Sequence, residues 1–513
     1  MAKRKRKRHA AEGEEDLPLP VGEAKKKKLV QEGGATPTTI QIILGTYEKV
    51  LHGITASTKP QVKGHDELDS VEFADTFLLN AHTSAIRCLA ISPSSTELFK
   101  SQKIILASGS SDQTVNLYHL STTPPQKSNR LSMPTLAGSN INENPRNREL
   151  GSLRHHSAAI NALHFPTRSK LLSGAEDNTI AVARTRDWTV LSTIKAPIPK
   201  AHGRPSGDTA PFGGTPTGVN DFAIHPSMKL MVSVGKGEKC LRLWNLVTGK
   251  KAGVLNFGRE LLQSVGEGKW ARGEGRMLEW NSLGEEFVVG FERGCAVFDM
   301  DSKPKCRILP SPLTKIHQLH YMASSGTDGE TKDLLTVSTE DGRILFYDTT
   351  DVVETQITKP ASKPEIPVLK AICQLGGAAE GLTGRVKDFE ILKPSGSEDF
   401  IVVTGSSDGA VRLWTVDESE LLDEPSTSRD LNGKVGISAN GGDGKANGNA
   451  MKPPTTRQIG LLLGTYEAGN RITCLKAFVM SETDSLKTNG SENGITRKNG
   501  EQVDSGDKNS TSS

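Results

Sequence analysis

The sequence has few cysteines, and they are dispersed along the chain. Its six cysteines contain no Cys-x-x-Cys pair and no spacing typical of a zinc site. Four of them (Cys88, Cys240, Cys295 and Cys474) lie in stretches expected to form strands, where a free cysteine behaves as a small apolar residue. We therefore expect a reducing, intracellular compartment and no disulfide framework.

Long apolar runs and a strong net charge are also missing. No apolar run approaches the roughly 20 residues that a membrane-spanning helix needs, and the charged N-terminus lacks the apolar core of a signal peptide. We expect a soluble protein without a membrane partner. The formal net charge of the 513 residues is only +3, so the surface as a whole is not built to bind a polyanion.

Motifs for catalysis or cofactor binding are absent as well. The sequence has no GxxxxGK[ST] phosphate loop, no HExxH and no GxSxG, and the glycine-rich Gly266–Gly275 lacks the strand–helix context of a nucleotide loop. His155-His156 and the pair His317 and His320 have no supporting cluster of cysteines or carboxylates. We expect no enzyme, no cofactor and no metal site.

One short unit recurs along the chain, and Asp399–Trp414 (DFIVVTGSSDGAVRLW) represents it best. Phe400–Thr404 is a β-branched and aromatic run, which favours a strand. The turn that follows contains Asp408 and Gly409, and glycine accepts a positive φ without a steric penalty. Ala410–Trp414 then alternates apolar and polar residues, as a returning half-buried strand does. Such a hairpin cannot bury its faces alone, so it needs copies.

Five further copies are present. They lie at Ile104–Leu120, Leu171–Val182, Leu230–Leu246, Glu286–Asp299 and Leu334–Asp348. Each of the six hairpins follows a short apolar strand; these strands are Ile86–Ser92, Ile160–Pro166, Val219–Pro226, Arg276–Asn281, Ile316–Met322 and Val386–Leu392. A fourth strand candidate, such as Leu191–Ile194 or Ala252–Phe257, comes after the hairpin. Four strands at a period near 40 residues resemble the blade of a WD-repeat propeller.

The two ends of this region complement each other. Thr39–Tyr47, Val50–Ala56 and Phe77–Leu79 are strands without a first repeat, and Arg471–Val479 is a strand without a hairpin. If the C-terminal strand is innermost and the N-terminal segments supply the other three, a seventh blade closes the ring and removes its open edges. The sequence thus predicts an all-β, seven-bladed WD-repeat β-propeller over residues 39–480.

Segments of different composition flank and interrupt this propeller. Residues 1–35 and 482–513 are predicted to be disordered tails, and insertions are predicted at 121–149, 201–218, 350–367 and 418–454. The N-terminal tail carries two basic clusters that predict nuclear import, with salt-sensitive, nonspecific RNA contacts or a solvated tail as alternatives. These clusters are Lys3, Arg4, Lys5, Arg6, Lys7 and Arg8, and Lys25, Lys26, Lys27 and Lys28.

The His, Ser/Thr, Asp and Trp positions of the WD repeat can be matched in several copies. We interpret them as a structural hydrogen-bond network between turn and strands, rather than as a hydrolase triad, because a buried carboxylate needs partners. The matched residues are His82, Ser108, Asp112 and Tyr118; His156, Ser173 and Asp177; Trp244; Asp341; and Thr404, Asp408 and Trp414.

Beyond the repeats, several segments are more specific than a generic WD repeat. They are LGTYEKVL at Leu44–Leu51, HHSAAINALHF at His155–Phe165, LLSGAEDNTIAV at Leu171–Val182, the segment from His225 to Lys250, GRVKDFE at Gly384–Glu390 and NRITCLKAF at Asn470–Phe478. In these segments the chain resembles the maintenance-of-killer type of fungal ribosome-assembly factors, which are related to the animal PAK-interacting proteins. The chain departs from this family in its long insertions and in lacking the basic C-terminal tail of some members.

The resemblance implies a non-enzymatic scaffold in the nucleus and nucleolus. In that role the chain would act in biogenesis of the large (60S) ribosomal subunit and in pre-rRNA processing, as a monomer within a larger assembly. Its partners would be proteins of the pre-60S particle, and pre-rRNA is a further candidate partner. The alternative is a negative regulator of a PAK-family protein kinase, and an enzyme of propeller type is the least favoured hypothesis.

Overall fold

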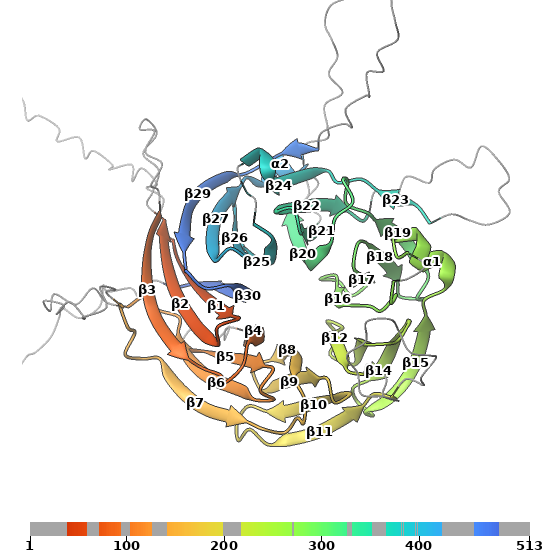
Figure 1. Cartoon of the computed structure of the whole chain (residues 1–513), viewed down its shortest axis with the longest axis horizontal. Coiled ribbons are helices and arrows are strands. Elements are labelled where there is room, and N and C mark those ends of the chain that lie inside the picture. The colour runs from red at the N-terminus through yellow and green to blue at the C-terminus, as the bar shows by residue number, and fades with distance from the viewer. Residues whose placement is uncertain are drawn as a thin grey trace, which may run out of the picture. The chain divides into compact units, whose positions relative to one another are not determined.

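A computed structural model describes residues 38–58, 71–93, 103–125, 141–198, 217–268, 271–325, 331–350, 366–422 and 456–481, apart from residues 381, 383, 396 and 398. In these residues the chain forms seven small sheets that follow one another around a ring (Figure 1). The predicted all-β fold and the number of blades are therefore confirmed. No helix among the described residues is long and apolar enough to cross a membrane.

Blades 1 to 3 each consist of four consecutive antiparallel strands. Blade 1 comprises β4 (Ile86–Ile91), β5 (Lys103–Ser110), β6 (Val115–Ser121) and β7 (Arg148–Leu153). Blade 2 comprises β8 (Ile160–Thr167), β9 (Lys170–Ala175), β10 (Thr179–Arg184) and β11 (Val190–Lys195). Blade 3 comprises β12 (Val219–Ile224), β13 (Leu230–Gly235), β14 (Cys240–Asn245) and β15 (Lys250–Asn256).

Blades 4 and 5 add a short parallel strand at the outer edge. Blade 4 comprises β16 (Met277–Trp280), β17 (Glu286–Gly290), β18 (Cys295–Asp299), β19 (Pro304–Ile308) and β23 (Val368–Leu369). Blade 5 comprises β20 (Ile316–Ser325), β21 (Thr331–Thr339), β22 (Arg343–Asp348), β24 (Cys373–Gly376) and β28 (Arg457–Gln458). Blade 6 comprises β25 (Val386–Leu392), β26 (Phe400–Ser406), β27 (Ala410–Val416) and β29 (Leu461–Glu467).

The seventh blade joins the two ends of the propeller region. Its strands are β1 (Thr39–Thr46), β2 (Val50–Thr58), β3 (Val71–Asn80) and β30 (Ile472–Val479). The order is β3-β2-β1-β30, and β1 pairs antiparallel with β30 from Ile40, opposite Val479, to Thr46, opposite Ile472. The predicted closure by the N- and C-terminal strands is confirmed, with β30 in the innermost position.

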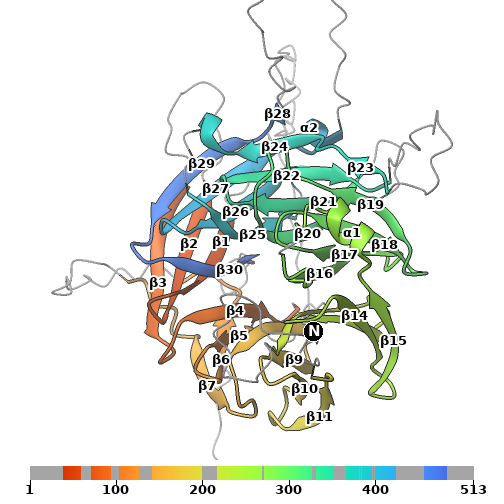
Figure 2. The same ribbon diagram turned by 45° about the vertical axis from the view of Figure 1, so that its right-hand side comes forward.

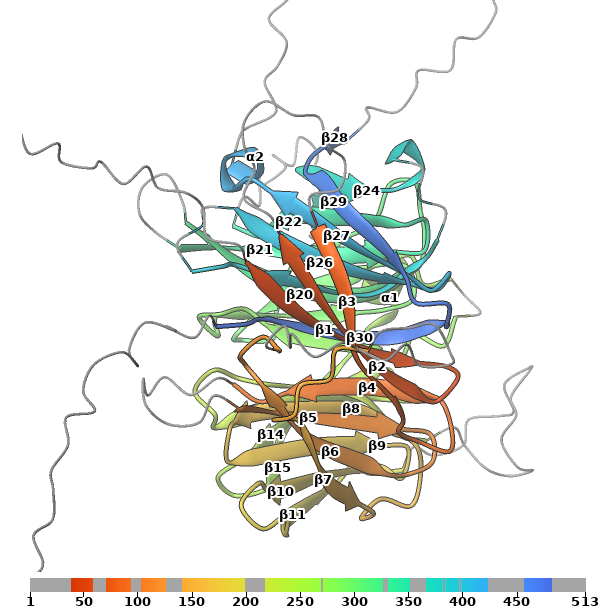
Figure 3. The same ribbon diagram turned by 90° about the vertical axis from the view of Figure 1, so that its left-hand side faces the viewer.

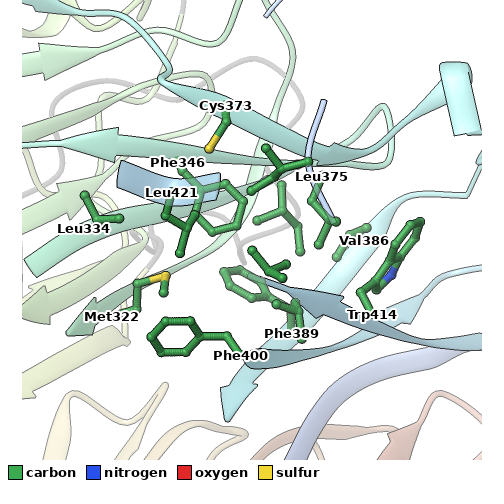
Figure 4. Close-up of a cluster of buried hydrophobic side chains, with 14 of the residues drawn as sticks. Met322, Leu334, Phe346, Cys373, Leu375, Val386, Phe389, Phe400, Trp414 and Leu421 are labelled. Carbon is green, nitrogen blue, oxygen red and sulfur yellow. The ribbon is translucent and has the colours of Figure 1, made fainter. Parts of the chain in front are cut away.

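The hydrophobic core lies between neighbouring blades. Strands such as β26 are buried along their whole length, because sheets cover them on both faces. Figure 4 shows the cluster between blades 5 and 6, where Met322 and Phe346 meet Phe389, Phe400 and Trp414. Figure 3 shows the blades in side view, with the sheets of neighbouring blades layered against each other. Burial between blades, rather than within one, is why a single hairpin needed copies.

The insertions differ in detail from the predicted boundaries. The segment 121–149 ends where β7 begins, so Arg148 and Glu149 belong to a strand. The segment 418–454 starts with the short helix α2 (Glu418–Leu422), and an unpredicted helix α1 (Arg259–Ser264) follows blade 3. A 3₁₀ turn, η1 (Ala378–Glu380), follows β24. The predictions for 1–35, for 482–513 and for most of the insertions concern residues outside the described ranges.

Candidate functional sites on the turn face and around the centre of the ring

We call one end of the ring the turn face. It carries the turns between the second and third strands of each blade, where Asp112 lies in blade 1. His82 Nδ1 lies 3.1 Å from Asp112 Oδ2, and His82 Nε2 lies 2.8 Å from Ser108 Oγ. Asp112 also accepts hydrogen bonds from Thr83 N at 2.9 Å and from Thr114 Oγ1 at 2.6 Å. Three of the four residues predicted for blade 1, namely His82, Ser108 and Asp112, therefore form one hydrogen-bond network.

Blade 2 repeats this arrangement. His156 Nδ1 lies 3.0 Å from Asp177 Oδ2, and His156 Nε2 lies 2.8 Å from Ser173 Oγ. His155, which the sequence analysis did not include in the network, also contacts Ser173: its Nε2 lies 2.8 Å from the same hydroxyl. Thr179 donates to Asp177 at 2.6 Å, as Thr114 does to Asp112. Two blades therefore tie their turn to the strands by the same chemistry.

The electrostatics of the two networks keep the carboxylates charged. Burial alone would raise the pKa of Asp112, but the hydrogen bonds from Thr114 and Thr83 outweigh it and lower the pKa to about 2. The pKa of Asp177 is lowered in the same way by Thr179 and Ser157. Burial lowers the pKa of His82 in spite of its aspartate neighbour. The Ser108 hydroxyl has no exposed surface, so a substrate cannot reach this Ser–His–Asp set.

The turn acids of three other blades have a different partner. No histidine among the described residues bonds to them; instead, an arginine on the third strand of the same blade pairs with the turn acid. The pairs are Glu238 with Arg242, Asp341 with Arg343 at 2.7 Å, and Asp408 with Arg412 at 3.4 Å. For Asp341 and Asp408, the sequence prediction placed the right residue in the turn but did not find this partner.

The remaining predicted network residues serve mainly in packing. Trp244 Nε1 donates to Ser233 Oγ at 2.8 Å, which joins two strands of blade 3. Thr404 Oγ1 donates to the carbonyl of Arg412 at 3.4 Å. Tyr118 and Trp414 are buried in the clusters between blades, and burial raises the pKa of Tyr118 to about 12.

The innermost strands share a feature that the sequence analysis missed. Six of these seven strands carry a β-bulge one residue after their start on the turn face. A bulge inserts one unpaired residue and redirects its side chain. The bulged residues are Arg87, Asn161, Asn220, His317, Lys387 and Thr473. The innermost strands surround the centre of the ring (Figures 1 and 2), so the bulges lie at the turn-face ends of the strands nearest that centre.

Four of the bulged residues bind the next blade. Asn161 Nδ2 donates to the Val219 carbonyl at 2.8 Å, and Asn220 Nδ2 donates to the Gly275 carbonyl at 2.8 Å. Thr473 Oγ1 donates to the Ile86 carbonyl at 2.7 Å, across the joint between blades 7 and 1. Arg87 instead pairs with Glu176 of blade 2 at 2.9 Å. The bulges thus act as joints between blades.

Carboxylates next to the bulges make a second set of joints. Asp221 accepts from the backbone N–H of Leu278 at 2.8 Å, and Asp388 accepts from that of Leu475 at 2.7 Å. Both side chains are buried, and burial raises the pKa of Asp221 to about 7 and also raises that of Asp388.

Further along the innermost strands, titratable groups of neighbouring blades meet. His320 Nδ1 lies 3.1 Å from Glu279 Oε2 of blade 4, and Lys476 of blade 7 pairs with Glu390 of blade 6. Burial disfavours the charged form of His320, but Glu279 overrides it and raises the pKa. Burial lowers the pKa of His164 to about 4, and the charge of Lys476 adds to this. These strands therefore carry opposite charges that compensate each other from blade to blade.

Comparison with known proteins agrees with this architecture. The model of the family "WD domain, G-beta repeat" matches residues 73–119 and 147–182, which include the two complete His–Ser–Asp networks. The chain is a WD-repeat propeller. A p21-activated protein kinase-interacting protein 1-like of Xenopus laevis is 25% identical over 388 residues, covering 76% of this chain and 77% of the relative.

Two fungal relatives of this WD-repeat propeller cover a similar share. Protein MAK11 of Saccharomyces cerevisiae is 25% identical over 399 residues, 74% of this chain and 78% of the relative. Shk1 kinase-binding protein 15 of Schizosaccharomyces pombe is 23% identical over 378 residues, 74% of this chain and 78% of the relative. The predicted resemblance to the maintenance-of-killer and PAK-interacting proteins is confirmed.

The WD-repeat propeller also has a cavity of about 240 Å³ on the turn face of blade 4. Its charged lining consists of Glu267, Arg272, Glu274, Arg276 and Glu292. Glu267 accepts from the Glu292 backbone N–H at 3.0 Å, and Glu274 accepts from that of Gly237 at 2.8 Å. Each of these two carboxylates therefore already has a backbone N–H as a partner. The described residues contain no cluster of three or more His, Cys, Asp or Glu residues placed to bind a metal ion.

The predicted nuclear-targeting clusters, Lys3–Arg8 and Lys25–Lys28, lie outside the described residues.

The bulges in the innermost strands did have a signal in the sequence. In the bulged strands, buried apolar residues lie three positions apart, as Ile86 and Leu89 do and as Val386 and Phe389 do. In a strand without a bulge, residues on the same face lie two positions apart.

Proposed function

We propose that this WD-repeat propeller is a non-enzymatic scaffold in the nuclear and nucleolar assembly of the large (60S) ribosomal subunit. In this role it binds proteins of the pre-60S particle, with pre-rRNA as a further partner, and it enters the particle as a monomer. The observation that carries the proposal is the similarity to MAK11 over three quarters of both chains, together with the resemblance in segments that generic WD repeats do not share.

The architecture supports a binding role. The ring is held by joints between blades, so its turn face presents side chains on a rigid frame. Several charged groups of that face are joined in ion pairs, such as Lys315 with Glu292 at 3.0 Å. A rigid polar rim of this kind suits recognition of a macromolecule.

Gradient sedimentation tests the proposal. The tagged protein in a cell extract should co-migrate with precursors of the large subunit, and its depletion should lower large-subunit levels and accumulate rRNA precursors. A truncation that removes β30 leaves blade 7 without its innermost strand, so it should lose this co-migration. A light, free peak with normal rRNA precursors would refute the proposal.

A second candidate function is binding and negative regulation of a PAK-family protein kinase. It is favoured by the names of two relatives, a p21-activated protein kinase-interacting protein and a Shk1 kinase-binding protein. Cellular location separates the two candidates, because a kinase regulator should be largely cytoplasmic. Recovery of a kinase with the tagged protein from a cytoplasmic fraction, and no association with ribosome precursors, would favour this second function.

A further inference from the structure

Lys387 is an exception among the joints between blades. It is the bulged residue of β25 in blade 6, at the position where Arg87, Asn161, Asn220 and Thr473 each bind the next blade. The Lys387 side chain makes no hydrogen bond or ion pair within the described part of the chain, although it is half-buried. An ammonium group held partly out of water without a partner is costly. The joint therefore has a free positive charge.

The neighbouring bulge in blade 5 is also incomplete. Its residue is His317, and the buried Nε2 of His317 has no partner among the described residues. Burial lowers the pKa of His317 to about 4, and the charge of Lys387 adds to this. The imidazole is therefore neutral near pH 7, so it adds no second charge but leaves a polar atom unpaired beside Lys387.

Other cations surround this position, and most have partners. Arg385 pairs with Glu340 at 3.2 Å, and the guanidinium of Arg471 lies 5.6 Å from the centre of the Tyr47 ring. Burial lowers the pKa of Lys387, and the charges of Arg385 and Arg471 lower it further. Glu340 acts in the opposite direction but does not compensate for them. The local potential is therefore positive, and an anion placed there would remove the repulsion.

We propose that Lys387 binds a carboxylate from an acidic segment of a partner protein, on the turn face of blade 6 near the centre of the ring. Arg385 and Arg471 attract the segment to the rim, and Lys387 donates to its carboxylate. This inference rests on the proposed function and names the chemistry by which one partner is held.

The distribution of charge favours an acidic polypeptide over RNA. The cations of the rim alternate with carboxylates, since Arg276 and Lys315 flank Glu292, and Arg87 and Lys236 flank Glu176. A phosphate backbone laid around the rim would meet these negative charges in turn. A single carboxylate side chain needs only the one uncompensated cation. A protein partner can supply such a charge without bringing a continuous polyanion.

The test measures binding of a short fluorescein-labelled peptide of aspartate and glutamate residues to the purified full-length protein, by fluorescence anisotropy. We expect Lys387→Gln to weaken binding about tenfold, which corresponds to about 1.4 kcal/mol. Lys387→Arg should retain binding. Arg87→Gln is the matched control: it removes one positive charge from the same strand position in blade 1, but from a cation that Glu176 already pairs. It should change the affinity less than twofold.

Several outcomes would overturn the inference. Equal weakening by Lys387→Gln and Arg87→Gln would mean nonspecific attraction to the rim. Tighter binding of polyuridylate RNA than of the peptide, with a steep salt dependence, would mean that the partner is a nucleic acid. A lower melting temperature for Lys387→Gln would indicate a structural joint instead, because a cation without a partner stabilises nothing.

A measurement in cells separates this inference from the proposed function. If the inference is right, Lys387→Gln should reduce co-sedimentation with large-subunit precursors while the protein stays folded. Normal co-sedimentation of Lys387→Gln would reject Lys387 as a contact and leave the assembly role standing. Absence of the parent protein from precursors, with peptide binding intact, would reject the assembly role alone.

Discussion

Replacing Asp112 by alanine should destabilise the propeller by about 3 kcal/mol. The carboxylate accepts from His82 Nδ1 at 3.1 Å, Thr83 N at 2.9 Å and Thr114 Oγ1 at 2.6 Å. Each buried donor that loses its acceptor costs roughly 1–3 kcal/mol. His82 is buried and should carry most of the loss, whereas Thr83 is exposed and can bind water instead. The expected total loss of stability is therefore well below the sum of three full desolvation penalties.

Urea unfolding followed by tryptophan fluorescence measures this loss, and Asp408→Ala in blade 6 is the matched control. Asp408 occupies the same turn position, but its side chain is 38% exposed and it bonds mainly to Ala410 N and Arg412. Arg412 keeps Ser406 Oγ as a partner at 3.2 Å. We expect a loss of about 1 kcal/mol, because the Asp408 carboxylate is partly exposed and Arg412 keeps a hydrogen-bond partner. Equal losses in the two variants would refute the argument from buried donors.

Three further predictions concern the rest of the ring. The pKa of Asp112 is about 2 in the folded protein and near 4 in the unfolded chain. The ionised carboxylate therefore contributes its full stabilisation of the fold above pH 4, and this contribution is lost as the pH falls toward 2. Over this range the melting temperature of Asp112→Asn should drop less than that of the parent. Lys476→Met leaves the partly buried Glu390 without its cation and should cost about 3 kcal/mol at pH 7, and a thermal melt that matches the parent would contradict the charge argument. Gly53→Ala should cost roughly 1–3 kcal/mol by urea unfolding, because a Cβ would overlap the Phe77 ring, whereas Gly268→Ala, with open space around it, should be neutral.

The blades could be predicted because each is encoded locally. The hairpin around Asp408-Gly409 combines a β-branched run, a turn and an alternating strand, and Gly409 indeed adopts a φ of +94°. Closure followed from two sets of strands that each lacked partners, at opposite ends of the propeller region. These arguments need only strand periodicity and the requirement that edges be covered.

The partners of the turn acids could not be predicted in the same way. Arg412 looked like the polar member of an alternating strand, and its pairing with Asp408 depends on which face of the strand the arginine occupies after the turn. The joints between blades depend on neighbours that are distant in sequence, such as Thr473 and Ile86. Apolar residues three apart at the start of each innermost strand indicate the bulge, but not the atom that its side chain will reach.

The bulges also explain why polar residues lie at the centre of an all-β ring. Each innermost strand has hydrogen-bonded neighbours on one side only, so its free edge must be satisfied by the adjoining blade or by water. Asn161, Asn220 and Thr473 do this with neutral side chains that bond to the next strand's carbonyl. Lys387 at the same position does not stabilise the joint in this way, since the neighbouring charges do not compensate its own charge. An asparagine or threonine at position 387 could complete the joint as it does in the other blades, whereas the lysine leaves a positive charge for the acidic partner that we propose.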